Sequence, residues 1–411
     1  MWHHLSVNPL ATVSAIGFYA ILLALAFPEI RERAMPLPKR TVGAQHLHLE
    51  GLDAYRGFAS LLVALGHMWW FASPLFQASQ GAFPPMARGA AAVPVFCVLS
   101  GFLISRSALA IRTAEDLRAY AIRRVFRIWP VYAVGVLLCA AMGLYGATAL
   151  PMRAFFADLF MFRVLWWPGY ANPVAWSLYH ELLFYALMPL IAVVAGRRHL
   201  ALFALLAIVA FVLADHPERN FGIWRFFMIG VLASELTSRL PVRWATATFV
   251  SGLIVGIFYM LMPQRMADVT SLVGLTVPRD DDAGLLLGLG CFLVLVATPH
   301  LPAVGRFLEA YPLRLFGMVS YSLYVTHLFF LQANYPDWRV LTQNLEFFGQ
   351  FEPMPFWYLP VVFLPGMLFW AIVCYVAVER PGIALGKRLA RREPVWPRGL
   401  GGNRQPGDNP A

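Results

Sequence analysis

Residues 52–67 read LDAYRGFASLLVALGH and place two ionisable side chains in one apolar run. Arg56 stands at the start of this run, and His67 follows eleven residues later. Eleven helical residues turn the chain by about 1100°, roughly 20° more than three full turns, so both side chains would share one helical face with Ser60 and Val63. The rise between them is about 16 Å, which is about half of a bilayer's hydrocarbon core. If Arg56 lies at one membrane surface, His67 lies near the middle, where an ionisable residue is costly and is a functional candidate.

The composition of the whole chain indicates an integral membrane protein. Of its 411 residues, 59% are hydrophobic and 13% are charged, whereas a soluble domain has about 25% charged residues. No polar or Gly/Ser-rich linker divides the chain, which favours one membrane domain. A net charge of +10 would suggest nucleic acid as the partner of a soluble protein. In a membrane protein, an excess of lysine and arginine in the cytoplasmic loops explains this net charge, and we expect no nucleic-acid partner.

Eleven apolar runs predict an all-α fold, a polytopic bundle of transmembrane helices with a ten-helix core and one extra N-terminal helix. The runs cover residues 10–27, 57–76, 90–111, 128–148, 175–195, 200–214, 221–236, 245–262, 284–300, 314–333 and 358–378.

Loop charges predict the orientation of this bundle. If residues 28–55 are cytoplasmic, 22 of the 32 lysines and arginines fall in cytoplasmic loops and 7 in outer loops. Cytoplasmic loops of membrane proteins carry such an excess of positive charge. We therefore predict an N-terminus outside and a basic C-terminus in the cytoplasm.

Three regions follow from these runs. Residues 1–49 hold the extra helix and a basic cytoplasmic linker, 50–382 form the membrane domain, and 383–411 are a basic cytoplasmic tail, expected to be disordered from Glu393 onward. Ala24-Leu25-Ala26 imitates a signal-peptidase site, but no Lys or Arg precedes the first run, which favours an uncleaved helix. A native start at Met35 is an alternative that leaves ten helices.

His67 is the first candidate for chemistry. A neutral imidazole is tolerated at mid-membrane and titrates near neutral pH, which suits proton abstraction. The alternative is a packing histidine bonded to a backbone carbonyl. Asp53 and Arg56 at the same end of the helix favour the functional interpretation, because a carboxylate and a cation there both need partners.

An arginine cluster is the second candidate. Arg123, Arg124 and Arg127 lie in RRVFRIWPVY, which we place in an inner loop over 112–132, leading into the next helix. Arginine forms paired hydrogen bonds to phosphates, so the cluster could bind a phosphate-bearing donor such as a coenzyme A thioester. A topology-setting or anionic-lipid-binding patch is the alternative.

Two further segments carry polar side chains within apolar runs. In NPVAWSLYHELLFY, Glu181 could orient a base, bind a sugar hydroxyl or pair with Arg225, and Trp176 lies near the outer end of the same helix. In YSLYVTHLFFL, hydroxyls and an imidazole occupy adjacent turns, where polar contacts between helices are the alternative to function. The latter residues are Tyr321, Tyr324 and His327.

Glu379 ends the last run in VERP, where we expect Pro381 to stop the helix, and it could pair with an inner arginine. No metal-ligand spacing, phosphate loop or redox motif occurs, and the four cysteines lie singly in apolar runs. We therefore predict neither a bound metal nor a disulfide framework.

Taken in order, these segments resemble the acyltransferase-3 family of membrane-bound O-acyltransferases. The resemblance runs from about residue 50 to 382 and includes the Arg-ten-residues-His spacing of the family. The motifs that carry it are LDAYRGFASLLVALGH, VFCVLSGFLIS, RRVFRIWPVY, WSLYHELLFY, YSLYVTH and VERP.

The resemblance implies transfer of an acyl group, usually acetyl, from cytoplasmic acyl-CoA to a hydroxyl of a carbohydrate or glycan of the bacterial envelope. It implies an inner-membrane location, with other envelope-biosynthesis proteins as partners and acyl-CoA as substrate, with no permanently bound cofactor. By position, His67 and Arg56 would be the essential pair, and Glu181 and Trp176 would match the WSLxxE motif. Ser100 and Gly101 would match the family's small-residue turn, and the three clustered arginines its basic motif.

The predicted reaction leaves two roles for His67 open, a general base or a transient carrier of the acyl group. Arg56 would fix the donor or polarise the thioester carbonyl. A rival interpretation is a transporter of a glycan or lipid-linked intermediate, in which these polar residues line a pathway. A structural subunit of an envelope complex would make them dispensable.

Overall fold

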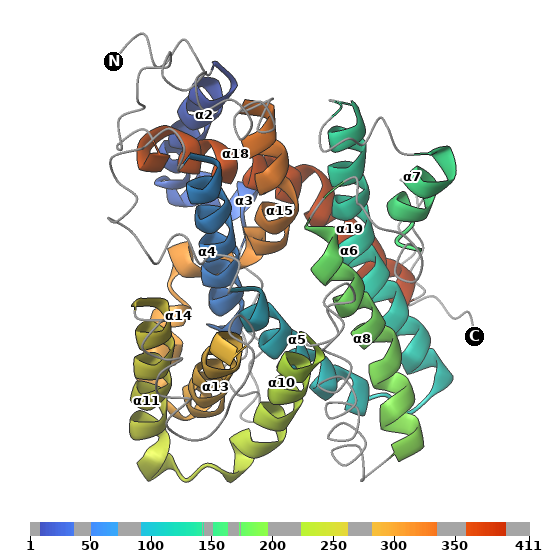
Figure 1. Cartoon of the computed structure of the whole chain (residues 1–411), viewed down its shortest axis with the longest axis vertical. Helices are drawn as coiled ribbons and strands as arrows, with labels where there is room; N and C mark the ends of the chain where they lie inside the picture. Colours follow the sequence, from blue (N-terminus) through green and yellow to red (C-terminus); the bar gives the residue numbers. More distant parts are fainter. Residues whose placement is uncertain are drawn as a thin grey trace, which may run out of the picture.

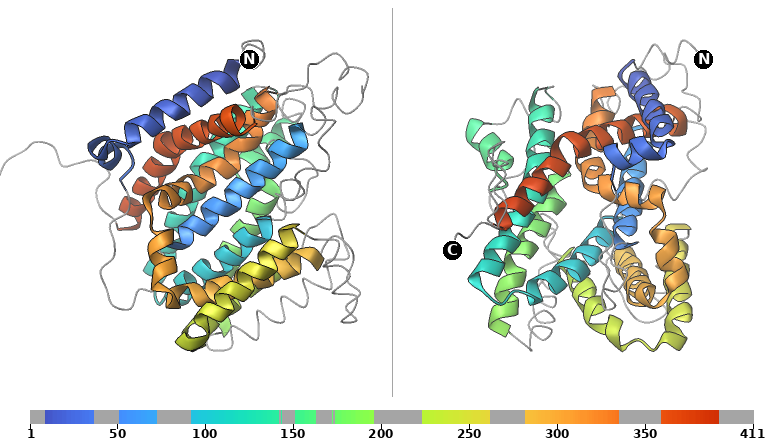
Figure 2. Two further views of the ribbon diagram at one scale, coloured as in Figure 1. Left: turned by 90° about the vertical axis from the view of Figure 1, so that its left-hand side faces the viewer. Right: turned by 180° about the vertical axis from the view of Figure 1, so that it is seen from behind.

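The structure is a computed structural model that describes residues 9–36, 51–72, 92–141, 143, 151–162, 172, 174–195, 223–261, 282–334 and 359–391. All regular elements in these residues are helices, which confirms the predicted all-α bundle. Figures 1 and 2 show long helices packed side by side, with the N-terminal helix against one side of the array. By length and composition, five of the described helices could cross a membrane, and up to seven if two bent pairs each count as one span.

Ten of the eleven expected runs fall on described helices. The run at 200–214 lies outside the described residues, as does the tail from Glu393 onward. The helices that match the ten runs are α2 (Pro9–Leu25), α4 (Leu52–Ala72), α5 (Val93–Leu109), α6 (Ala114–Ala141), α8 (Ala175–Ala195), α10 (Trp224–Leu236), α11 (Val242–Leu261), α13 (Asp282–Ala297), α15 (Tyr311–Asn334) and the continuous segment η12 (Leu359–Phe363), α18 (Leu364–Cys374) and η13 (Tyr375–Glu379).

The arginine cluster lies within α6, and the expectation of a loop at 112–132 was wrong. α6 begins at Ala114 and is 28 residues long. Its start is stabilised by a reciprocal cap, because Asp116 N–H donates to Thr113 Oγ1 while Thr113 N–H donates to the Asp116 carboxylate. The first turns of α6 are polar, so apolar runs alone do not indicate that the helix begins at Ala114.

The helix at the C-terminal end continues past Pro381, where we expected it to stop. α19 (Arg380–Ala390) follows η13, a π-helical segment, so that the whole stretch from Pro360 to Ala390 is one candidate span. Pro381 stands in the first turn of α19, where a missing N–H costs little. α19 packs on α6, and Gly382 and Gly386 allow this close approach, since a Cβ on either would lie within 3 Å of Phe126.

The extra N-terminal helix belongs to the bundle. At one end of α2, Ala11 N–H donates to the Asn334 side chain of α15 at 3.1 Å. Trp370 of α18 donates to Ser14 at 3.1 Å. The chain then bends by 114° into α3 (Pro28–Ala34), where the Ala34 carbonyl accepts a bond from Arg380 at 2.8 Å.

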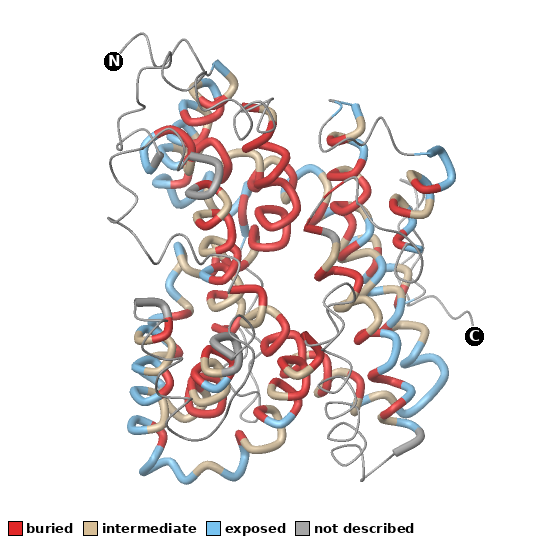
Figure 3. The backbone as a smooth tube through the Cα atoms, in the orientation of Figure 1, coloured by how far each residue is buried: buried red, intermediate tan, exposed pale blue. Residues whose placement is uncertain are grey.

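Helices α4 and α15 form a closely packed, parallel pair. A Cβ on Gly57 would lie 2.8 Å from Gly317 N, so glycine lets the two backbones approach closely. His67 and His327 meet further along the same pair. Figure 3 shows α15 buried over most of its length, whereas α11 exposes one side. Two opposing glycines, Gly101 of α5 and Gly230 of α10, allow a second close crossing.

Four short helices complete the described chain. These are α7 (Met152–Leu159), η10 (Thr237–Arg239) and the pair η11 (Thr298–His300) and α14 (Pro302–Leu308). α7 is anchored by Asp158, a fully buried carboxylate that accepts bonds from the hydroxyls of Tyr132 and Tyr179. It therefore holds α6 and α8 together on one side of the bundle.

Candidate functional site

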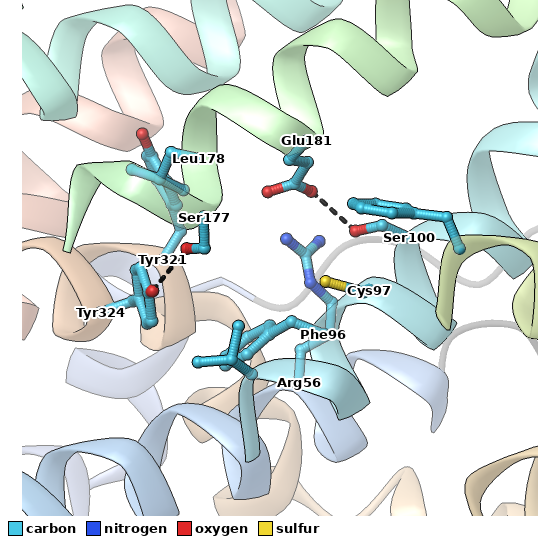
Figure 4. A pocket seen from close by; sticks show the side chains of 11 residues that line it. Arg56, Phe96, Cys97, Ser100, Ser177, Leu178, Glu181, Tyr321 and Tyr324 are labelled. Atoms are coloured by element: carbon cyan, nitrogen blue, oxygen red, sulfur yellow. Dashed lines mark hydrogen bonds between the residues drawn. The ribbon is translucent and has the colours of Figure 1, made fainter. Parts of the chain in front are cut away.

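A polar pocket opens where α4, α5, α8, α10 and α15 meet. Figure 4 shows side chains from separate helices pointing into it, although they lie far apart in the sequence. The pocket is small, with a cavity volume of about 20 Å³, room for about one water molecule. Its polar lining residues are Arg56, Ser100, Ser177, Glu181, Tyr321 and Tyr324.

Glu181 is held by two hydroxyl groups. Ser100 donates to Glu181 Oε1 at 2.7 Å, and Tyr185, one turn further along α8, donates to the same oxygen. Both bonds use Oε1, so they leave Oε2 available on the pocket side. Figure 4 shows the guanidinium of Arg56 pointing across the pocket toward this carboxylate. A cation and an anion therefore face one small space that a polar substrate group could enter.

Hydroxyl groups form the other side of the pocket. Tyr324 OH and Ser177 Oγ lie 2.6 Å apart, joining α15 to α8. Tyr321 OH donates to the backbone carbonyl of Ile128 in α6 at 2.9 Å. These residues are buried, and their hydrogen bonds fix the positions of three helices around the pocket.

The inner arginines divide into an inward pair and an outward member. Arg124 donates to Ser107 at 3.2 Å, and its guanidinium lies over the rings of Tyr120 and Tyr185 at 5.4 and 5.3 Å. Arg123 points outward and is exposed. The inward pair is Arg124 and Arg127. Arg124 lies next to Tyr185, which bonds Glu181, so the pair reaches toward Glu181. Arg123 does not.

Arg127 connects this cluster to three carboxylates. It interacts electrostatically with Asp53 of α4, with Glu379 and with Glu181, and Arg124 is repelled by Arg127 and Arg56. Glu379 is buried and accepts a bond from Ser322 at 2.6 Å. Arg124, Arg127 and Arg56 thus lie close together among three carboxylates.

The histidine of the opening motif is paired with a second histidine. His327 Nε2 and His67 Nδ1 lie 3.1 Å apart, with the two ring centroids separated by 5.0 Å. His327 is completely buried, whereas His67 is partly exposed. Tyr324 joins this pair to the polar pocket, because it lines the pocket and its ring lies 5.9 Å from the His327 ring.

Trp176 and Arg225 lie beside the site. Trp176, His180 and Trp224 form a row of edge-to-face rings, with Trp224 donating its indole N–H to His180 at 3.1 Å. The Arg225 guanidinium lies 5.0 Å from the Phe226 ring centroid. Neither Trp176 nor Arg225 lines the polar pocket, so both lie outside it.

Several residues in or next to the pocket were absent from our sequence-based candidates for chemistry. Tyr185 and Ser177 lie on the same helix as Glu181, at spacings of four residues. Positions i±4 share a helical face, so this signal could have identified them. Cys97 and Phe96 also line the pocket but lie in a uniformly apolar stretch, where no pattern separates them from core residues.

A second cavity of about 410 Å³ lies between α4, α5, α11 and α13. Its lining is apolar apart from the Tyr55 hydroxyl, which is bonded to Thr298, and Cys291. Among the described residues that line it there is no carboxylate, imidazole or guanidinium, so this lining suits hydrocarbon. Within the part of the chain that the structure describes, no cluster of three or more His, Cys, Asp or Glu could hold a metal ion.

The structure thus has a pocket with a cation and a carboxylate beside an imidazole pair, inside a bundle of apolar helices of the multi-pass membrane class. The chain belongs to the acyltransferase-3 family, since the model of the acyltransferase domain matches residues 49–377. The protein is accordingly an O-acyltransferase of the multi-pass membrane type, as the resemblance implied.

Two relatives support this assignment. One is named "Putative acetyltransferase ORF330", from Acidianus two-tailed virus, and is 28% identical over 66% of this chain and 80% of its own length. The other is named "Putative membrane-bound transacylase BcsY", from Komagataeibacter xylinus, and is 25% identical over 81% of this chain and 82% of its own length. No solved structure matches the chain.

Proposed function

We propose that this enzyme transfers an acyl group, with acetyl as the first candidate, from acyl-CoA to a hydroxyl of a carbohydrate or glycan acceptor. The observation that carries the proposal is the succession of three groups carried by α6, α8, α4 and α15. The inner arginines, the Arg56–Glu181 pocket and the His67–His327 pair follow one another through the bundle. This order suits an anionic donor that binds at the arginines and a proton transfer that takes place at the histidine pair.

Acyl-CoA is the proposed donor because its phosphates suit the inward pair, Arg124 and Arg127. Arginine binds phosphate with two parallel hydrogen bonds, and clustered arginines that repel one another are stabilised by an anion. The 28-residue helix α6 carries this pair directly before its apolar half. The donor would then reach Arg56 with its thioester end.

The reaction needs a base near the acceptor hydroxyl, and we assign this role to His67. As a base, His67 takes the hydroxyl proton, the oxygen attacks the thioester carbonyl carbon, and the carbon–sulfur bond breaks. The leaving thiolate then receives the proton back from His67. In the alternative, a nitrogen of His67 attacks the thioester carbon and the carbon–sulfur bond breaks; the acceptor oxygen then attacks the acyl carbon, the carbon–nitrogen bond breaks, and the acceptor's proton ends on the leaving thiolate. Arg56 would stabilise the negative carbonyl oxygen.

We further propose the bacterial inner membrane as the location, with the N-terminus outside and the C-terminus in the cytoplasm. The support is the distribution of lysine and arginine over the loops. The donor would enter from the cytoplasm and the acceptor from outside, with envelope-biosynthesis proteins as partners. The small volume of the polar pocket means that substrates must widen it.

The test is reconstitution of the purified protein in liposomes with acetyl-CoA and a panel of envelope glycans. We expect thiol release that depends on acceptor, and an acetyl mass added to the glycan. His67→Ala should reduce turnover by about 10² to 10⁴-fold, while His300→Gln, at the end of the bundle, should not. Retained acylation in His67→Ala would contradict the assignment.

The rival, a transporter of a glycan or lipid-linked intermediate, makes a different prediction. It requires labelled glycan to cross the liposome membrane without consumption of thioester. Transport without thiol release would replace our proposal with the rival.

A further inference from the structure

The proton positions on the histidine pair can be derived from its acceptors. His327 Nδ1 lies 3.1 Å from the carbonyl oxygen of Leu323, one turn earlier in α15. A carbonyl oxygen can only accept a hydrogen bond, so Nδ1 of His327 carries the proton. A neutral imidazole has one proton, and Nε2 of His327 is therefore an acceptor.

The same reasoning then fixes His67. Its Nδ1 lies 3.1 Å from Nε2 of His327 and also 3.1 Å from the carbonyl oxygen of Val63. Both neighbours accept, so Nδ1 of His67 donates to them. In the opposite arrangement, with His327 Nε2 as donor, the carbonyl oxygens of Leu323 and Val63 would both face nitrogen lone pairs.

His67 consequently keeps its free lone pair on Nε2. We propose that His327 is a positioning residue that holds His67 in the Nδ1–H tautomer and so directs Nε2 toward the acceptor hydroxyl. This inference rests on the proposed function, in which His67 is the base. It assigns to a histidine the part that a carboxylate plays in hydrolase triads.

The burial of the two rings supports this division of roles. His327 is completely buried and is fixed by the Leu323 carbonyl and by contact with the Tyr324 ring. His67 is partly exposed, as a group that meets substrate must be. When His67 takes the acceptor's proton on Nε2, its Nδ1–H bond to His327 strengthens, because the donor is then charged.

The catalytic step with His327 in place balances without any further reactant. The acceptor O–H bond breaks and the proton moves to His67 Nε2, while the oxygen bonds to the carbonyl carbon of the thioester. The carbon–sulfur bond then breaks, and the proton passes from Nε2 to the leaving sulfur. His327 keeps its own Nδ1 proton throughout and touches neither substrate.

Three variants of α15 test this role in the reconstituted enzyme. His327→Phe keeps a ring but removes the acceptor, and we expect kcat to fall by about 10- to 100-fold, the usual effect of an outer-shell partner, with KM for acetyl-CoA changed less than about two-fold. His327→Gln places an amide oxygen near the former Nε2 and should restore most of the loss. Ser320→Ala, a buried position on the same helix whose hydroxyl bonds only Gly317 in α15, serves as the folding control.

Nitrogen NMR reads the tautomer directly and does not depend on turnover. In protein labelled with ¹⁵N-histidine in lipid bilayers, the His67 signals are identified by their loss in His67→Gln. We expect a protonated Nδ1 and an unprotonated Nε2 in the wild type, and a mixture of tautomers in His327→Phe.

Two results would overturn the proposal: wild-type kcat in a folded His327→Phe variant, or a wild-type His67 that carries its proton on Nε2. If the wild type consumes no thioester with any acceptor, the proposed function fails, while the NMR result still decides the tautomer. The two failures are therefore distinguishable.

Discussion

The two sides of α4 differ in what they offer. One side carries Arg56 and His67 toward α8 and α15, where hydroxyls and charges surround a cavity of about 20 Å³. The other side carries Phe58 and Leu62 into an apolar cavity of about 410 Å³ against α11 and α13. The charged side chains and the histidine pair therefore lie on the tightly packed side, and the open space lies on the side whose described lining is apolar apart from Tyr55 and Cys291.

This difference follows from the cost of polar groups in a membrane. A cation and a carboxylate inside an apolar bundle are tolerated only where other side chains satisfy them. Ser100 and Tyr185 supply such partners to the Glu181 carboxylate on one side of α4. The charges are therefore tolerated because that side is closely packed. Substrates can enter only when this packing opens.

Among the residues that line the polar pocket, the largest effect is expected from removing the cation. Arg56→Ala should lower kcat by about 10² to 10³-fold, because the guanidinium would stabilise the charge on the thioester oxygen. Arg56→Lys should recover only part of the rate, since an ammonium cannot form a planar fork. The measurement is thiol release under saturating acetyl-CoA, and equal rates for Arg56→Ala and wild type would remove Arg56 from the mechanism.

A smaller effect is expected at the carboxylate that faces Arg56. Glu181→Gln keeps the shape and an oxygen that accepts from Ser100, but removes the charge, so we expect kcat/KM to fall by about 10- to 100-fold. Ser100→Ala removes one bond to Glu181 and should cost about ten-fold at most. Steady-state kinetics of both variants test this order, and a greater loss in Ser100→Ala than in Glu181→Gln would contradict it.

The inner arginines allow a matched comparison within one helix turn. Arg124→Ala should raise KM for acetyl-CoA by about ten-fold, whereas Arg123→Ala, at the exposed position, should change it less than about two-fold. Steady-state kinetics of thiol release over a range of acetyl-CoA concentrations measures both. Equal losses would indicate general attraction of the donor to a basic surface.

The smallest effects on turnover are expected for variants on the apolar side. A Cβ on Gly256 would meet only Leu287 at 4.0 Å, so Gly256→Ala should leave turnover and thermal stability unchanged. A Cβ on Gly252 would lie 2.7 Å from the backbone oxygen of Gly290, so Gly252→Ala should lower thermal stability with kcat of the folded fraction unchanged. Thermal unfolding in detergent checks the pair, and lost turnover in Gly256→Ala would give the apolar cavity a part in the reaction.

The sequence predicted the fold class and most of the helices because apolar runs are long and their spacing is regular. It also predicted the common helix of Arg56 and His67, since helical periodicity is local. It could not predict that His67 meets His327, because those residues are 260 positions apart. The packing of α4 on α15 depends on two glycines, which carry no sign of their partner in the sequence.

Errors in the predicted elements arose at polar segments. The start of α6 was missed because its first turns are charged and hydropathy cannot distinguish a solvated helix from a loop. The continuation past Pro381 was missed because the preceding π-helical turn is not encoded in any pattern we used. For the site, Glu181 was found as a charge in an apolar run, whereas its partner Tyr185 resembles an ordinary core residue.

The π-helical turn at 375–379 has a consequence for the way this chain tolerates length changes. Arg380 N–H bonds the carbonyl of Tyr375, five residues earlier, so this turn holds one residue more than an α-helical turn. Deleting one residue here would restore α-helical pairing instead of breaking the helix. It would rotate α19 by about 100° relative to α18 and turn Gly382 and Gly386 away from Phe126. The extra residue thus sets the rotation of α19 about its axis and determines which face of this helix packs on α6.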